Sequence, residues 1–341
     1  MADRSNKPWR IAFAGFRHSH IMSLYDLAQR EPRMQLVAAC ESDPATADTL
    51  RRQGKVQLTH PDLNAMLAGA QCDIVAIGDY FAARGRIAIA ALKAGKHVIA
   101  DKPLCTSLDE LHEIEALSRA RKLSVGCMLD MRGSAAVRTL RRLILAGEIG
   151  PVHTIVVTGQ HPLLPGSRPA WYFEPGKHGG TINDIAIHAF DALPWITGRR
   201  IARTCAARAW NARLPQYPHF KDCAQFMLEL DNGGGILCDV SYLAPDGCGY
   251  SAPQYWRLTC HGTGGVAEIT GDSHPLLLAT HADKAFREIP LDPPRPDAAI
   301  HDFLQELAGE SGTDSPLTTA AVLEASRQAL LVQQAADDAK A

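Results

Sequence analysis

Residues 11–20 read IAFAGFRHSH, an apolar run that ends at Gly15 and opens into a helical segment over about residues 21–30. The next apolar run covers residues 36–40. A strand, a helix and a second strand at this spacing are typical of a βαβ unit, in which both strands lie parallel in one sheet. The stretch therefore predicts the start of an α/β domain built on a parallel, doubly wound sheet.

The same alternation continues for about 150 residues. Further strands are expected over residues 74–77, 97–100 and 124–128, and further helices over residues 86–94, 108–121 and 135–146. Gly150 and Pro151 follow the last of these helices. Because this pair favours a turn, we expect a first domain of residues 1–150.

After residue 151 the pattern changes. Apolar runs over residues 152–158, 224–230, 235–241, 256–261 and 266–269 are separated by turn residues such as Asp231, Asn232 and Gly233. Helices are expected near residues 183–197, 298–307 and 318–336. Residues 151–341 are therefore expected to form an α+β domain with a large, mostly antiparallel sheet, whose C-terminal helix is free to pack back on the first domain.

Composition excludes several classes of protein. The chain has 341 residues, of which 46% are hydrophobic, enough for two globular domains with sizeable cores. Its formal net charge is -2, so nucleic acid as a partner has no electrostatic support. The longest apolar runs, such as residues 87–92, are too short to span a bilayer, and residues 1–10 lack the apolar core of a signal peptide. We therefore expect a cytoplasmic protein.

The nine cysteines are an odd number, and none of them forms a C-x-x-C pair. Neither a disulfide framework nor a thiolate zinc site is therefore indicated. We expect reduced and mostly buried thiols.

Two segments carry side chains that can move protons. Gly179 and Gly180 lead into Asp184 and His188, and a spacing of four residues places those two side chains on one face of a helix. Lys102 follows the expected strand 97–100, and the carboxyl ends of such strands face the crevice where open α/β sheets bind ligands. The sequence predicts that the three converge in one catalytic site. A capping pair, and a lysine in a structural ion pair, are the alternatives.

The turn after the first strand keeps only the first glycine of the dinucleotide fingerprint G-x-G-x-x-G, since Gly15 is followed by Phe16, Arg17 and His18. Its position is nevertheless the expected one, and Glu41 ends the second strand 26 residues later. A carboxylate there can accept hydrogen bonds from ribose hydroxyls and repel a 2′-phosphate, so NAD is favoured over NADP. Arg17 adds charge near a pyrophosphate. Glu41 can also belong to the cap of the next helix, and the two roles can coexist.

The order of these features resembles the Gfo/Idh/MocA oxidoreductases, named for glucose–fructose oxidoreductase and inositol dehydrogenase. The resemblance rests on the glycine turn, the acidic end of strand two, AALKAGKHV at residues 90–98 running into Asp-Lys-Pro-Leu at 101–104, and the later Gly-Gly with Asp-x-x-x-His. It covers nearly the whole chain, with residues 126–150 matching the family's domain junction. The family's E-K-P lysine maps onto Lys102, and its Asp and His map onto Asp184 and His188.

The resemblance implies an NAD(P)-dependent dehydrogenase or reductase, with a Rossmann domain, that transfers hydride to or from a sugar or cyclic polyol. The residues it assigns to the cofactor, together with those from the glycine turn, are Gly15, Phe16, Arg17, His18, Glu41, Asp79, Arg84, Asp101 and Lys102. The expected substrate contacts are Lys102, Arg132, Trp171, His178, Asp184 and His188. His188 would be the base, Lys102 would stabilise negative charge on the reacting oxygen, and Asp184 would orient the pair or bind a neighbouring hydroxyl.

Two departures from the family pattern stand out. The tripeptide begins with Asp101 where the family usually has Glu, which shortens the reach of the carboxylate. The cofactor loop that usually reads T-P-N-x-x-H reads DYFAAR at residues 79–84, so Arg84 stands where the family often has His. These changes indicate a divergent branch with a weak or altered cofactor site.

Several alternatives stay open. By residue type, His18 and His20 could bind a metal, but capping or cofactor contacts are favoured for them. Asp184 and His188 could also hold a divalent ion, but Lys102 would repel it. We therefore expect no metal. Trp171 is either a wall on which a sugar stacks or ordinary core, and His178 is a substrate contact or a solvated loop residue.

Two other functions also stay open. The same family contains lyases and glycosidases that retain NAD without net turnover. The incomplete glycine fingerprint also permits a non-enzymatic metabolite sensor, although a sensor would have no need for the catalytic set. Because the open face of an antiparallel sheet tends to be covered, we expect a dimer or tetramer.

Overall fold

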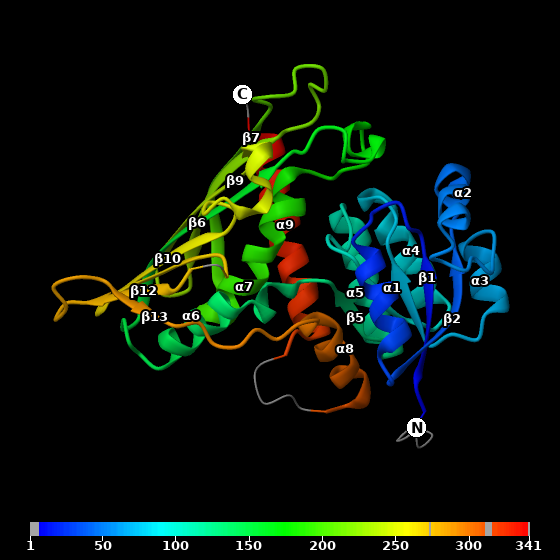
Figure 1. Cartoon of the computed structure of the whole chain (residues 1–341), viewed down its shortest axis with the longest axis horizontal. Helices are drawn as coiled ribbons and strands as arrows, with labels where there is room; N and C mark the ends of the chain where they lie inside the picture. The colour runs from blue at the N-terminus through cyan, green and yellow to red at the C-terminus, as the bar shows by residue number, and fades with distance from the viewer. Residues whose placement is uncertain (1–6, 273, 311–315, 340–341) are drawn as a thin grey trace. The chain divides into compact units, whose positions relative to one another are not determined.

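The computed structural model describes residues 7–272, 274–310 and 316–339 (Figure 1). The chain forms two compact units. Unit 1 comprises Met1–Met128, Pro169–Gly179 and Ile300–Leu323, and unit 2 comprises Leu129–Arg168, Gly180–Ala299 and Glu324–Ala341. This division differs from a single boundary near residue 150, because helix α6 (Ala135–Leu145) packs on elements of unit 2 and the chain later returns to unit 1 twice.

Unit 1 is built on a five-stranded parallel sheet in the order β2-β1-β3-β4-β5. The strands are β1 (Trp9–Ala14), β2 (Met34–Cys40), β3 (Ile74–Ile77), β4 (His97–Ala100) and β5 (Val125–Cys127). The helices between them are α1 (Ile21–Arg30), α2 (Pro44–Gln53), α3 (Leu63–Gly69), α4 (Phe81–Lys93) and α5 (Leu108–Arg121). The predicted doubly wound parallel sheet is confirmed.

Local sequence explains where several of these helices begin. Asp43 caps α2, since its carboxylate accepts a hydrogen bond from the Thr46 backbone N–H at 2.9 Å, and Pro44 occupies the first helical position. Ser107 caps α5 in the same way through the Glu110 N–H. These caps fix the helix starts that follow two strands of the sheet.

The core of unit 1 is completed from the far end of the sequence. Helix α8 (Ala298–Ala308) contributes Ile300, Phe303 and Leu304 to the cluster of buried side chains around β1 and β3. Gly126 makes room for this helix, since a Cβ there would lie 2.8 Å from the Phe303 ring. The alternation of the first 150 residues gives no sign of this return.

Unit 2 contains an eight-stranded sheet in the order β13-β12-β11-β10-β6-β9-β8-β7. Its strands are β6 (Val152–Pro162), β7 (Ile201–Trp210), β8 (Cys223–Leu230), β9 (Gly235–Ala244), β10 (Arg257–Gly262), β11 (Gly265–Thr270), β12 (Leu276–Thr280) and β13 (Arg287–Ile289). Only the pair of β6 and β9 is parallel. The predicted mostly antiparallel sheet is therefore confirmed.

Helices cover one face of this sheet (Figure 1). Phe190 of α7 (Ile187–Thr197) stacks on Phe226 of β8, with ring centroids 5.4 Å apart, and α6 packs against β11 and β12. The last helix, α9 (Thr319–Asp338), begins in unit 1 and continues in unit 2. In unit 1 the Thr319 hydroxyl accepts a hydrogen bond from the Val125 N–H at 2.9 Å.

None of the helices in the described ranges has an apolar stretch long enough to cross a membrane. All nine cysteines lie in the described residues as free thiols, and seven of them are buried. Burial raises the pKa of Cys40, Cys105 and Cys260 to about 12, so these thiols stay protonated and unreactive at neutral pH. The expectation of reduced, mostly buried thiols is confirmed.

Candidate functional site

The turn after β1 is shaped by Gly15, whose φ of +81° suits glycine. A Cβ at this position would lie 2.8 Å from the Asp79 Cβ, so only glycine lets the two loops approach so closely. The His18 N–H donates to the Gly78 carbonyl at 3.0 Å and fixes the rest of the turn. The turn therefore lies tightly against the Asp79 loop at the carboxyl ends of β1 and β3, although two glycines of the fingerprint are missing.

Glu41 closes this turn from the end of β2. Its buried carboxylate accepts hydrogen bonds from the Phe16 N–H at 2.6 Å and the Asp43 N–H at 2.8 Å. The Arg17 Nε lies 3.2 Å from an Asp79 oxygen and 3.7 Å from a Glu41 oxygen. Burial raises the pKa of Glu41 above its ordinary value, although both backbone hydrogen bonds oppose the rise. The two roles weighed for Glu41 are thus compatible, because it braces the loop and places a carboxylate there.

Arg84 is fully buried and hydrogen-bonded around its guanidinium. Its Nε donates to the Asp79 carbonyl at 2.8 Å. Its Nη1 donates to the carbonyls of Asp101 at 2.7 Å, Lys102 at 2.5 Å and Pro103 at 3.2 Å, and its Nη2 donates to the Asp101 carboxylate at 3.0 Å. The expectation of a direct cofactor contact stays a prediction, and the complete burial of this side chain counts against it.

His18 forms a very short hydrogen bond with the same Asp101 oxygen that Arg84 binds. Burial tends to raise the pKa of Asp101, but the charge of Arg84 and the hydrogen bond from His18 outweigh it and hold that pKa well below its ordinary range. Burial also lowers the pKa of His18, against the opposing pull of Asp101. An ionised Asp101 can only accept, so we assign the proton of a neutral His18 to Nδ1.

Within the described ranges, His18, His20 and Asp101 are the one group whose donor atoms lie close enough for a metal, within 4.8 Å of one another. The electrostatics oppose a cation there. Arg84 already binds the Asp101 oxygen, and His20 directly precedes α1, whose amino terminus carries positive partial charge. These charges support hydrogen bonding rather than metal binding, and the absence of a metal stays a prediction.

Trp171 and His178 are buried in unit 1, within an aromatic cluster that includes Phe81 and Tyr172. The Trp171 indole N–H donates to the Arg17 carbonyl at 3.1 Å. These contacts support the interpretation of Trp171 as an ordinary core residue rather than as a wall on which a sugar stacks. His178 is not a solvated loop residue either, since its ring packs against Phe81 and Tyr172 at 5.4 and 4.9 Å.

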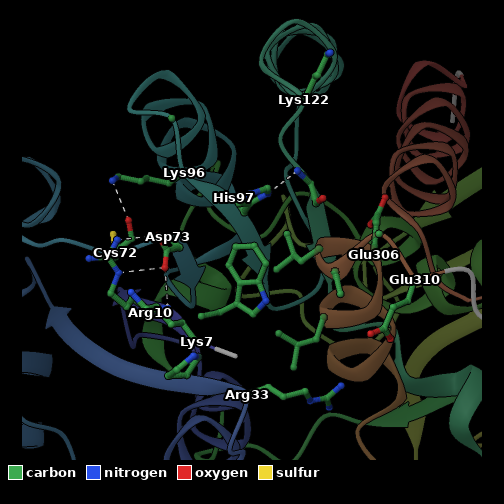
Figure 2. A pocket seen from close by; sticks show the side chains of 18 of the residues that line it. Lys7, Arg10, Arg33, Cys72, Asp73, Lys96, His97, Lys122, Glu306 and Glu310 are labelled. Atoms are coloured by element: carbon green, nitrogen blue, oxygen red, sulfur yellow. Dashed lines mark hydrogen bonds and ion pairs between the residues drawn. The ribbon is translucent and has the colours of Figure 1, made fainter. Parts of the chain in front are cut away.

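Unit 1 also has a groove of about 1270 Å³ at the opposite end of its sheet. Figure 2 shows Arg10 paired with Asp73, and Lys96 reaching the Cys72 carbonyl, beside His97 at the start of β4. Ligands of open α/β sheets bind beyond the carboxyl ends of the strands. This groove lies at the amino ends and is therefore not the cofactor site.

Asp184 lies in unit 2 in a π-helical turn, Ile182–Ala186, that leads directly into α7. Such turns are rare and often mark functional sites. The Asp184 carboxylate is buried and accepts a very short hydrogen bond from the Tyr242 hydroxyl of β9. The sequence predicted the helix but neither the π turn nor Tyr242, because a partner 58 positions away leaves no local signal.

The π turn is capped by a residue of α9. The Gln333 side-chain oxygen accepts hydrogen bonds from the backbone N–H groups of Ile182 at 2.9 Å and Asn183 at 3.4 Å. Gly180 has a φ of +97°, and a Cβ there would lie 2.1 Å from the Gln333 side chain. The second glycine of the Gly-Gly pair is therefore required by this close approach.

His188 lines a cavity of about 370 Å³ within unit 2. The lining includes Tyr250, Tyr255 and Trp256, and the Trp256 ring lies 5.9 Å from the His188 ring, nearly perpendicular to it. These aromatic side chains were not among the predicted substrate contacts. These three residues lie between β9 and β10. The sequence predicted a strand from residue 256 onward and gave no indication of a cavity there.

Arg132 is a predicted substrate contact, but in the structure its side chain binds another residue of unit 2. Its Nε lies 2.9 Å and its Nη2 2.6 Å from the carboxylate of Asp191, a two-pronged pair in which both residues are buried. This geometry supports a structural ion pair between the segment after residue 129 and α7. The assignment of Arg132 to the substrate stays a prediction, and this ion pair supports the structural alternative.

Two family models match the chain. The model described as "Oxidoreductase family, NAD-binding Rossmann fold" matches residues 9–129, and "GFO/IDH/MocA C-terminal domain" matches residues 137–268. The chain belongs to the Gfo/Idh/MocA family. The resemblance carried by the glycine turn, the Asp-Lys-Pro segment and the Asp-x-x-x-His helix is thereby confirmed.

Relatives of this Gfo/Idh/MocA chain are distant. It is 34% identical to the 1,5-anhydro-D-fructose reductase of Ensifer adhaerens, over 32% of each chain. It is 27% identical to the D-glucoside 3-dehydrogenase of Escherichia coli K12, over 70% of this chain and 71% of that one. The matches to two curated relatives cover only 46% and 32% of their lengths.

A crystal structure of a protein from Erwinia carotovora atroseptica shares the whole architecture, with a TM-score of 0.82 and 25% identity. The match covers 96% of this Gfo/Idh/MocA chain and 98% of the other. The two proteins thus share this fold.

Proposed function

We propose that the chain is an NAD-dependent oxidoreductase that transfers hydride between the nicotinamide and the hydroxyl-bearing carbon of a sugar or cyclic polyol. The observation that carries the proposal is that Lys102, Asp184 and His188 are all retained in a divergent member of the family. The surroundings of two of them add support. Arg84 binds the backbone around Lys102, and Tyr242 binds Asp184.

NAD, when bound, accepts the hydride released by the carbon. The chain must then remove the hydroxyl proton and stabilise the charge that develops on oxygen. We assign the proton to His188, whose imidazole ordinarily titrates near pH 6.5, and the stabilisation to the Lys102 ammonium. Asp184, held by Tyr242, would orient the histidine or bind a neighbouring hydroxyl.

The residues of the glycine turn fit a dinucleotide. Gly15 lets the turn after β1 lie close to the Asp79 loop, since a Cβ would collide with Asp79, and Arg17 offers a partly exposed guanidinium beside it. Glu41 and Asp79 place two carboxylates around that guanidinium. This set suits a diphosphate linked to a ribose that carries free hydroxyls, and it disfavours a second phosphate on that ribose.

The substrate class is supported by the lining of the unit 2 cavity. Tyr250, Tyr255 and Trp256 offer aromatic faces near His188, which suit the apolar C–H face of a sugar ring. Two relatives are named for sugar substrates, 1,5-anhydro-D-fructose and D-glucosides. We therefore favour a pyranose-like ring or a cyclic polyol of similar size.

The proposal is tested by titrating the protein with NAD and NADH, followed by nicotinamide fluorescence, and then screening sugars and polyols for NADH formation. We expect binding of the cofactor and turnover of at least one ring substrate. A chain that binds no nicotinamide would be a sensor rather than an oxidoreductase. Cofactor that stays bound without net turnover would indicate the lyase or glycosidase chemistry known in the family.

Cofactor choice gives a first prediction. Replacing Glu41 by Gln should narrow the preference for NAD over NADP by about 5-fold or more, because a like-charge contact of roughly 1 kcal/mol is removed. The measurement is the pair of dissociation constants for the two cofactors in each variant. Asp48→Asn, which removes an exposed carboxylate of α2, is the control and should leave the ratio unchanged. A wild-type protein that binds NADP as tightly as NAD would refute the assignment.

Self-association gives a second prediction. Met227, Leu237 and Val156 are register partners on neighbouring strands of unit 2, and all three side chains are exposed. We propose that a second copy of the chain covers this apolar row. Leu237→Glu should then raise the dissociation constant of the oligomer by about 10-fold or more, measured by sedimentation. Leu145→Glu, at an exposed site on α6, should have no such effect.

A further inference from the structure

Arg84 of α4 and Asp101, just after β4, meet inside unit 1. Their side chains form a buried ion pair, with Arg84 Nη2 3.0 Å from the Asp101 carboxylate. Both side chains are almost fully buried, with exposed fractions of 0% and 2%. Such a pair is costly to break, because either charge would be left buried without a partner.

The Arg84 guanidinium also binds backbone carbonyls. The same Nη1 atom donates to the carbonyls of Asp101, Lys102 and Pro103 at 2.7, 2.5 and 3.2 Å. A single planar group therefore holds three consecutive carbonyl oxygens and, through its Nε, the Asp79 carbonyl at 2.8 Å. Neither His nor Lys carries donors in that number and arrangement.

We propose that Arg84 and Asp101 are a pair of positioning residues that fixes the backbone of Lys102. The proposal rests on the catalytic role proposed for Lys102. In this arrangement His18 is the third member, because it donates to the same Asp101 oxygen from the turn after β1. The pair thereby connects the cofactor turn to the residue that acts on the substrate.

A direct cofactor role for Arg84 does not match its surroundings. The side chain is fully buried, and its hydrogen-bond partners are backbone carbonyls and one carboxylate. A purely structural role would lower stability without changing turnover by the folded protein. A positioning role instead lowers kcat while the affinity for NAD stays the same, because displacing a reacting group by about 1 Å can reduce the rate about 100-fold.

The first experiment compares Arg84→Lys with the wild type. We expect kcat to fall by about 10- to 100-fold, while the dissociation constant for NAD changes less than about 2-fold. Arg86→Lys, at an exposed arginine two positions along α4, is the matched control and should leave kcat unchanged. A loss confined to NAD affinity, or a lower melting temperature with normal kcat, would overturn the proposal.

The second experiment is a double-mutant cycle across the ion pair of Arg84 and Asp101. Arg84→Lys and Asp101→Asn should each lower kcat and the melting temperature, and the double variant should lose less than the two single losses combined, because each change disrupts the same pair. Additive losses would overturn the coupling. If Asp101→Asn alone fails to fold, the kcat and NAD affinity of Arg84→Lys still decide the matter.

The cycle also separates this proposal from the proposed function. Coupling between the two sites is measured in the melting temperature as well as in kcat. If the wild type turned over no sugar or polyol, the proposed function would fail, and with it the positioning role. The coupling between Arg84 and Asp101 would then be decided by the melting temperatures alone, where additivity would overturn it.

Discussion

Replacing Lys102 by Ala is expected to lower kcat by about 100- to 1000-fold, because the ammonium that stabilises the developing oxyanion is lost. The affinity for NAD should stay within a few-fold of the wild-type value. The fold should survive, since Arg84 binds the Lys102 backbone carbonyl rather than its side chain. Steady-state kinetics, a fluorescence titration and circular dichroism measure the three quantities.

The matched control for this variant is Lys93→Ala, which removes an exposed lysine at the end of α4 that pairs with Glu113. It should have no effect on kcat. A Lys102→Ala protein with nearly normal kcat would show that this lysine has a structural role. One that does not fold would point to the same conclusion.

Replacing His188 by Asn is expected to remove the ionisation step from the pH profile of oxidation and to lower kcat by about 10²- to 10⁴-fold. In the wild type the rate should rise with pH as the imidazole loses its proton, because only the neutral ring can accept the proton of the hydroxyl. Asn can still donate a hydrogen bond but cannot take the proton. The measurement is kcat from pH 5 to 9 in both proteins.

Persistence of the same step in His188→Asn would assign the proton to another group. The double variant with Lys102→Ala adds a further test. If both side chains act on one substrate oxygen, their combined loss should be smaller than the product of the single losses. Multiplicative losses would mean that the two residues serve separate steps.

The parallel sheet was predictable because its strands are short apolar runs with clear ends. The structure places β3 at Ile74–Ile77 and β4 at His97–Ala100, as the sequence indicated. Strand β7 (Ile201–Trp210) was not predicted, since alanines and arginines replace the expected alternation. It lies at the edge of its sheet and pairs with one neighbour, so few of its side chains need to be apolar.

The site was predictable only as far as motifs specify positions along the chain. The motifs located Lys102, Asp184 and His188, but a motif does not state where a neighbouring side chain points. Arg84 and Arg132 were therefore assigned to ligands, although buried carboxylates hold both. Tyr242 was missed because it meets Asp184 through sheet topology, not through any local spacing.

The cap that Gln333 provides has a consequence for how the chain matures during synthesis. Ile182 and its capping side chain are 151 positions apart. At a translation rate of about 5–20 residues per second, the ribosome reaches Gln333 roughly 8–30 s after it has passed Ile182. Throughout that interval, the turn that carries Asp184 lacks the two hydrogen bonds that the Gln333 side chain accepts from its backbone. In a nascent chain stalled before Gln333, Asp184 should therefore lie in a turn that is not yet capped.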